Sequence, residues 1–234
     1  PYMAGTNGGG AFVLIYLACI VVIGLPIMMA EIVIGRRASS SPVNSMKSAA
    51  LDSNKSSNWQ LIGWGGLVAG ILILSFYSVL AGICINYVFI SALPDLQLSS
   101  EEQFSITTSS ASNLLIWHTI FIFVTAGVIA SGIKNGIGRF VRILMPLLGF
   151  ILILMVLNAF INGDFLKGLQ FLFSPDFSQV NPQTFLSAMG QAFFSLSLGM
   201  GAIMTYGAYM SDDQKILNTS ITVGGLDTLV ALMA

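Results

Sequence analysis

The sequence predicts an all-α, polytopic membrane protein. Hydrophobic residues make up 55% of its 234 residues and charged residues only 8%, whereas soluble domains carry about 25% charged residues. Apolar stretches close to 20 residues long, enough to cross the hydrocarbon core of a bilayer as helices, recur along the chain. One of these stretches also contains residues that should interrupt its helix.

Six predicted spans form a single transmembrane domain over residues 1–234 that we expect to be incomplete. They cover Ala11–Ile34, Leu61–Ile90, Leu114–Ile133, Phe140–Ile161, Phe185–Met210 and Ile216–Ala234. Polar loops separate most of them, over residues 37–60, 94–113 and 162–184. Because the chain starts without Met and ends inside an apolar stretch, we expect a fragment of a longer protein.

Basic residues indicate the orientation of the spans. Eight of the nine lysines and arginines flank the connections after the first, third and fifth spans, and only Lys167 lies on the other side. Cytoplasmic loops are enriched in Lys and Arg. We therefore expect loops 37–60, 134–139 and 211–215 to be cytoplasmic.

The fifth span carries the sequence Gly190-Gln-Ala-Phe-Phe-Ser-Leu-Ser-Leu-Gly-Met-Gly201. Each glycine weakens a helix by about 1 kcal/mol relative to alanine. Amides and carbonyls that an opened turn frees at membrane depth must face protein or a wet cavity, because lipid cannot bond them. We therefore predict a broken helix within residues 185–210 that holds a small solute and its ions, as in a transporter.

Ser195 and Ser197 lie next to the glycines of this stretch. Each hydroxyl could bond the carbonyl four residues back, as serines in membrane helices often do. Beside Gly199 and Gly201 a ligand role is favoured, because hydroxyl and carbonyl oxygens suit Na⁺. The N-terminus of a half-helix would in turn place partial positive charge near a substrate carboxylate.

Four further polar side chains lie inside predicted spans: Tyr16, Glu31, Gln191 and Asp227. A carboxylate at the position of Asp227 costs on the order of 3 kcal/mol unless it is paired or hydrated. It is either an interfacial polar residue or a cation ligand, and the second is favoured. Glu31 either pairs with the nearby arginines or accepts bonds from the amides of a broken helix. Tyr16 alone also fits a packing tyrosine with a satisfied hydroxyl.

Enzymatic and nucleic-acid-binding functions are not indicated. The one histidine, His118, lies near the outer end of its span and cannot act as a base for Ser195. Phosphate-loop, nucleophile and metal-ligand motifs are missing from the sequence, as is a basic patch with interleaved aromatics. We therefore expect neither catalysis nor a nucleic-acid partner.

Motifs along nearly the whole chain resemble the neurotransmitter:sodium symporter family, especially its bacterial amino-acid transporters. They are Pro1-Tyr2 with Asn7-Gly-Gly-Gly-Ala-Phe12, Gly24-Leu-Pro26, Ser75-Phe-Tyr-Ser78, Gly136 with Pro146, Gly190–Tyr206 and Asp212-Asp213-Gln214. The resemblance implies a leucine-transporter-like fold with inverted repeats. It also implies Na⁺-coupled symport of an amino acid by alternating access across the plasma membrane, here the bacterial inner membrane.

The resemblance also implies roles for particular positions. Tyr77 and Phe194, otherwise ordinary core aromatics, would close over the substrate, with the Tyr77 hydroxyl on its carboxylate. Ser195 would also contact the substrate, and the pocket for the substrate's side chain would be lined by Ile73, Ser197 and Met200.

The same resemblance places ion sites. Ser195 and Asp227 would be ligands of the first sodium site, which the substrate carboxylate completes. The region where chloride-dependent members hold their anion would include Tyr16, Gln191 and Ser195. Glu31 would brace the unwound segments.

Three departures from the family pattern carry consequences. The family's first helix and everything after its seventh lie outside the sequence, and with them the second sodium site. Asp227 stands where many members have Asn, and Ala231 where Ser is frequent, so we expect a carboxylate to replace chloride and chloride not to be required. Met200 stands where an aromatic residue is frequent. Because methionine adapts to large apolar groups, a hydrophobic or aromatic amino acid is favoured.

Two alternatives remain open from the sequence. The first is a sodium-coupled symporter of another small solute, such as a betaine, taurine or a γ-amino acid. The second is a membrane sensor on the same fold that binds its ligand without transporting it.

Overall fold

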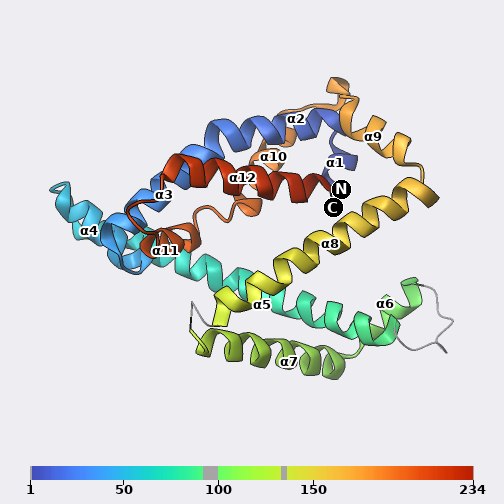
Figure 1. The fold of residues 1–234 in the computed structure, drawn as a ribbon, viewed down its shortest axis with the longest axis horizontal. Helices are drawn as coiled ribbons and strands as arrows, with labels where there is room; N and C mark the ends of the chain where they lie inside the picture. Colours follow the sequence, from blue (N-terminus) through green and yellow to red (C-terminus); the bar gives the residue numbers. More distant parts are fainter. Residues whose placement is uncertain (1, 92–99, 133–135, 234) are drawn as a thin grey trace. The chain divides into compact units, whose positions relative to one another are not determined.

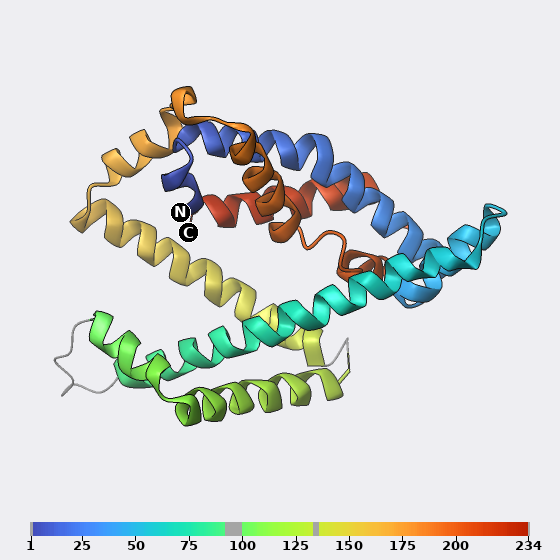
Figure 2. The ribbon, with the colours of Figure 1, turned by 180° about the vertical axis from the view of Figure 1, so that it is seen from behind.

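The computed structural model describes residues 2–91, 100–132 and 136–233, and these are almost entirely helical (Figures 1 and 2). Packing divides the chain into two compact units, one of residues 1–69 and 149–234 and one of residues 70–148. The division falls inside two long helices, α5 (Gln60–Ser91) and α8 (Gly138–Asn162).

Five helical stretches are long and apolar enough to cross a membrane, which agrees with the predicted fold class. They are Gly10–Ala38, Ser57–Ile90, Ala111–Ala130, Gly138–Asn162 and Ile216–Met233 (the last is α12). The fifth predicted span, 185–210, is a broken helix. The predicted span ends Ile133 and Ala234 lie outside the described residues, as do residues 134 and 135 of a loop predicted to be cytoplasmic.

The first span consists of α2 (Gly10–Cys19), a π-helical turn (Ile20–Gly24) and α3 (Leu25–Ala38). Pro26 explains the wider turn. A proline has no amide hydrogen, and its ring collides with the carbonyl four residues earlier in a regular α-helix. In the π-turn the amide of Leu25 instead bonds the carbonyl of Ile20, five residues back.

The core of the first unit forms where α2 packs against α10 (Pro182–Ser195). Phe12 of α2 and the small residues Ala188 and Ala192 of α10 are buried in one apolar cluster. Because the alanines are small, the two helices can approach closely. This contact positions the C-terminal end of α10 beside the first span.

The broken span has the predicted form. α10 ends at Ser195, residues 196–201 are not helical, and α11 (Ala202–Ala208) follows. The start of α10 is held by a capping box: the Asn181 side chain accepts from the Thr184 amide, and the Thr184 hydroxyl accepts from the Asn181 amide. The hydroxyl of Thr184 also lies 3.3 Å from Oδ1 of Asn7, which ties the segment before α2 to α10.

α3 and α11 cross at a close backbone contact. A Cβ on Gly35 would lie 2.0 Å from the carbonyl oxygen of Met204, and a Cβ on Gly207 would lie 2.7 Å from that of Ile32. Small residues of this kind let membrane helices approach closely enough for extensive van der Waals contact. The crossing therefore fixes α11 against the first span.

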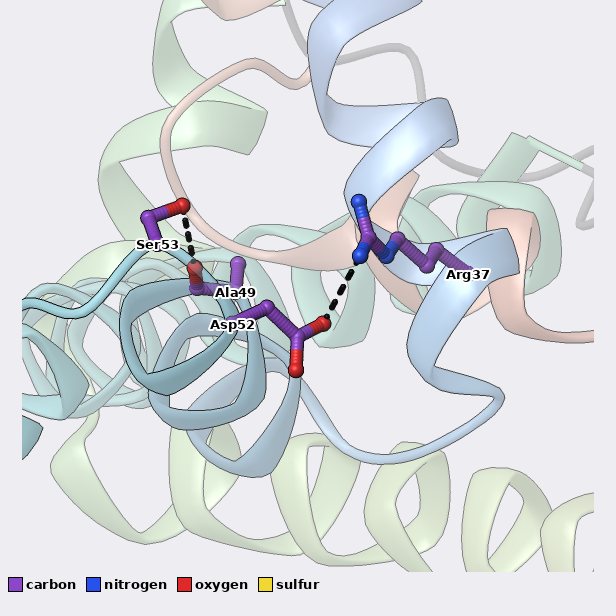
Figure 3. Close-up of polar contacts among 4 residues, drawn as sticks. All are labelled: Arg37, Ala49, Asp52 and Ser53. Carbon is purple, nitrogen blue, oxygen red and sulfur yellow. Dashed lines mark hydrogen bonds and ion pairs between the residues drawn. The ribbon is translucent and has the colours of Figure 1, made fainter.

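The predicted polar loops contain three helices: α4 (Pro42–Asp52), α6 (Ser100–Ser109) and α9 (Phe165–Phe173). The length of apolar stretches does not reveal these three helices, because each is too short to cross a bilayer. α4 is tied to α3 by an exposed ion pair, in which Arg37 Nη2 lies 3.0 Å from Asp52 Oδ2 (Figure 3). Its end is closed by the Ser53 hydroxyl, which donates to the Ala49 carbonyl.

Gly8 and Gly9 pack against the segment after α9. Gly9 forms an isolated β-bridge with Pro175, and the Asp176 amide donates to the Gly8 carbonyl. The exposed Asp176 carboxylate accepts from the hydroxyl and the amide of Ser178. These two bonds favour the ionised form and lower the pKa of Asp176 below its usual value.

The second unit consists of α5 from residue 70 onward, α6, α7 (Ala111–Ala130) and the first part of α8. α5 and α7 lie side by side (Figures 1 and 2), and a Cβ on Gly82 of α5 would lie 2.8 Å from the His118 amide nitrogen of α7.

The crossing of α3 and α11 predicts the effect of a single methyl group. Gly35→Ala would place that group against the Met204 backbone, and overpacking of this kind costs about 1–3 kcal/mol. We expect a lower apparent Tm for the purified protein. Gly225→Ala in α12 is the matched control, because nothing lies within 4 Å of its added Cβ. Equal apparent Tm values for the two variants would contradict the close crossing.

Candidate functional site

The break between α10 and α11 is built from left-handed residues. Ser197, Gly199 and Gly201 have φ values of +55°, +81° and +77°. Glycine adopts this conformation without strain, whereas an L-residue such as serine pays roughly 1–2 kcal/mol for it. The break therefore follows from the spacing of the two glycines, and Ser197 is held in a conformation that its surroundings must support.

Few main-chain bonds span the break. The Ser197 amide donates to the Phe194 carbonyl at 3.2 Å and the Leu198 amide to the Phe193 carbonyl at 2.9 Å. The first bond reaches three residues back and the second five residues back, and together they close the end of α10. Beyond them the regular helical ladder stops until α11, so the break exposes main-chain oxygens that the ladder would otherwise use.

Glu31 of α3 supports the break from the side. Its carboxylate Oε1 accepts a hydrogen bond from the Gly199 amide at 2.8 Å, and the residue is 6% exposed. The nearby arginines bond elsewhere: Arg36 donates to the Gln214 carbonyl and Arg37 pairs with Asp52. Of the two sequence interpretations of Glu31, the geometry matches an acceptor for a freed amide.

Two further elements pack directly on the break. A Cβ on Gly66, near the start of α5, would lie 3.0–3.1 Å from the main chain of Gly199 and Met200. A Cβ on Gly201 would lie 2.9 Å from the ring of Pro42, the first residue of α4. Sequence reasoning missed both contacts, because a glycine inside an apolar helix does not reveal which main chain it faces.

Ser195 links three helices through its hydroxyl. It donates to Asp227 Oδ2 of α12, and Tyr16 of α2 lies 3.1 Å away, hydroxyl to hydroxyl. Because the Ser195 proton is directed to the carboxylate, Tyr16 donates to Ser195. Ser195 therefore does not bond the carbonyl four residues back, as Thr228 does in α12. Tyr16 is 5% exposed and Asp227 is half-buried.

This arrangement gathers hard oxygen ligands where the helix is open. A carboxylate, two hydroxyls and freed carbonyls are the donors that alkali and alkaline-earth cations prefer. Since the carboxylate lies inside a span, a cation beside it would offset much of the cost of burying its charge.

The remaining predicted site residues fall into two groups. Phe194, Ser197 and Met200 lie at the break, with Phe194 half-exposed, and Gln191 lies half-buried on α10 one turn before Ser195. Ile73 and Tyr77 lie on α5 in the second unit. The structure therefore brings together the residues of the first unit, while the positions of Ile73 and Tyr77 relative to them stay predictions.

Comparison with known sequences identifies close relatives. The family described as the sodium:neurotransmitter symporter family matches residues 1–115 and 96–234. An uncharacterized sodium-dependent transporter of Haemophilus influenzae is 35% identical over 248 residues, and the uncharacterized sodium-dependent transporter YhdH of Bacillus subtilis is 34% identical over 238 residues. Both alignments cover 100% of this chain but 53% and 52% of the relatives. The chain thus spans about half the length of these relatives.

A solved structure is also similar to this chain. The crystal structure of MhsT in complex with L-phenylalanine matches with a TM-score of 0.89 and 42% sequence identity. The match covers 99% of this chain and 53% of MhsT. The broken span and its neighbours therefore belong to a fold already seen in a protein that binds an amino acid.

The bond from Gly199 to Glu31 predicts a difference between two substitutions. Glu31→Ala leaves the amide without its acceptor inside the protein, which costs about 1–3 kcal/mol. Glu31→Gln keeps an oxygen for this bond and should lose less. We expect lower thermal stability and faster amide hydrogen exchange at residues 199–201 for Glu31→Ala, with Glu31→Gln closer to the wild type. Unchanged exchange in both variants would show that Glu31 does not hold the break.

Proposed function

The chain belongs to the sodium:neurotransmitter symporter family, and on this premise we propose that it forms part of a symporter that couples Na⁺ entry to amino-acid uptake. The observation that carries the proposal is the bond between Ser195 and Asp227 at an opened helix in mid-span. The relatives are sodium-dependent transporters rather than enzymes, which agrees with the sequence expectation.

We place the coupling ion at Ser195 and Asp227. Both oxygens lie where α10 ends, so freed carbonyls are available to complete a coordination shell. The Ser195 hydroxyl is already held in place by Tyr16. A ligand that is positioned in advance loses little conformational entropy on binding, which favours the ion.

For the substrate we propose an amino acid with a hydrophobic or aromatic side chain. MhsT, which is similar over 99% of this chain, was solved with L-phenylalanine, and this favours an amino acid over a betaine or taurine. Flexible Met200 would adapt to a large apolar group. The proposed contacts are Ile73, Tyr77, Phe194, Ser195, Ser197 and Met200.

Chloride is not required in this proposal. Tyr16, Ser195 and Gln191 form the region where an anion would lie, and the Asp227 carboxylate already accepts from Ser195 there. A fixed negative charge makes a second, mobile anion electrostatically unfavourable at this place.

The protein is a multi-pass membrane protein, and we propose the bacterial inner membrane as its location. With the positive-inside rule, loops 37–60, 134–139 and 211–215 would face the cytoplasm. α4 and the Arg37–Asp52 pair, which Figure 3 shows, would then lie on the cytoplasmic side.

Removing the carboxylate of Asp227 tests the sodium site. In the complete transporter, Asp227→Ala should raise the Na⁺ concentration for half-maximal uptake about 10- to 100-fold, because a bond to a charged group contributes about 1.5–3 kcal/mol. Thr228→Val is the control, because the Thr228 hydroxyl donates to the Gly224 carbonyl within α12. Uptake of a labelled amino acid against Na⁺ concentration measures both. An unchanged Na⁺ dependence in Asp227→Ala would remove this residue from the site.

Replacing chloride with gluconate tests the anion hypothesis. Uptake by the wild-type transporter should not change, because Asp227 supplies the negative charge. The double variant Asp227→Asn/Ala231→Ser should become dependent on chloride, since it has lost that charge and gained a hydroxyl. A wild type that fails without chloride would refute the hypothesis.

A further inference from the structure

A groove of about 420 Å³ lies between α7 and α8 in the second unit, away from the broken span in sequence. Its walls are mostly apolar and include Val124, Val128, Phe140 and Ile143. One cationic side chain, Arg139, lines the same groove. An apolar groove with a cationic side chain among its described lining residues matches the chemistry of an amphiphile with an anionic head.

Two glycines shape the groove. A Cβ on Gly136 would lie 2.1 Å from the Val128 carbonyl oxygen, so α7 and the start of α8 nearly touch at this position. Beside Gly127, in contrast, nothing lies within 4 Å of an added Cβ. The close approach at Gly136 therefore holds the helices together while the missing side chain at Gly127 leaves the groove open.

Arg139 is the polar group that needs a partner. No ion pair of Arg139 occurs among the residues that the structure describes. The Ser131 hydroxyl, also in the wall of the groove, already donates its proton to the Gly127 carbonyl at 3.0 Å. Among the described residues that line the groove, the guanidinium is therefore the donor that is free for an anion, and its planar fork suits a phosphate.

The depth of Arg139 in the membrane fits a lipid headgroup. Arg139 is the second residue of α8, a helix long and apolar enough to cross the membrane, so it lies at the end of a span. Arginine at such an end lies at the level of the headgroups, and basic pockets between spans on the cytoplasmic side bind anionic lipids. The apolar walls continue from there into the region of the acyl chains.

We propose that this groove binds an anionic phospholipid, with the lipid phosphate on Arg139 and one acyl chain against Val124, Val128 and Phe140. The site is independent of the proposed ion and substrate contacts, none of which lies on α7 or on residues 138–143. The charge of Arg139 selects the headgroup, and the opening at Gly127 admits the chain.

Native mass spectrometry of the complete transporter tests the site, with dioleoyl-phosphatidylglycerol and dioleoyl-phosphatidylethanolamine as probes. We expect the wild type to retain more of the anionic lipid. Arg139→Gln should weaken retention of phosphatidylglycerol about fivefold, the change that corresponds to about 1 kcal/mol per basic residue near a membrane surface. Arg142→Gln is the matched control, because Arg142 lies on the same helix but does not line the groove.

Gly127→Leu provides the steric test. The side chain would fill the groove without meeting a neighbour at its Cβ, so retention of both lipids at this site should fall while the apparent Tm in detergent alone stays unchanged. Equal effects of Arg139→Gln and Arg142→Gln would overturn the proposal. So would lipid retention that Gly127→Leu does not alter, or a mass shift showing that a second protein copy covers the groove.

Discussion

The structure depends on one constraint: a helix that opens inside a membrane must find new partners for its main-chain groups. Lipid offers none, and each unsatisfied group costs several kcal/mol. Here the Gly199 amide bonds Glu31, while Gly66 and Pro42 pack against the same segment. Without these neighbours the Gly199 amide would lack its acceptor and the open segment 196–201 would lose its packing.

The same constraint connects the fold to the proposed chemistry. Opening the helix at Ser195 releases carbonyls at the point where α2 and α12 bring a hydroxyl and a carboxylate. The freed main-chain carbonyls, which destabilise the break when they lack partners, are thus groups that can bind an ion. Glu31 accepts from the Gly199 amide, whereas the proposed ion ligands are Ser195 and Asp227, so structural support and the proposed ion binding use different side chains.

Much of this arrangement could be predicted from the sequence, because membranes impose strong rules. Apolar length gave the spans, and glycines in mid-span gave the break at 196–201. Asn181 and Thr184, which form the capping box of α10, could also be recognised in the sequence. The helix α4 and the contacts of Gly66 and Pro42 could not be predicted, since they depend on which segments meet in three dimensions. For Glu31 the sequence left two partners, and only packing decided between Arg and the Gly199 amide.

The most direct test of the central claim is a cryo-electron microscopy structure of the complete transporter in Na⁺ with a bound aromatic amino acid. The account predicts an open main chain between the two half-helices and ion density within coordinating distance of the Ser195 hydroxyl and the Asp227 carboxylate. A continuous α-helix through residues 196–201, or an ion bound away from both side chains, would contradict it.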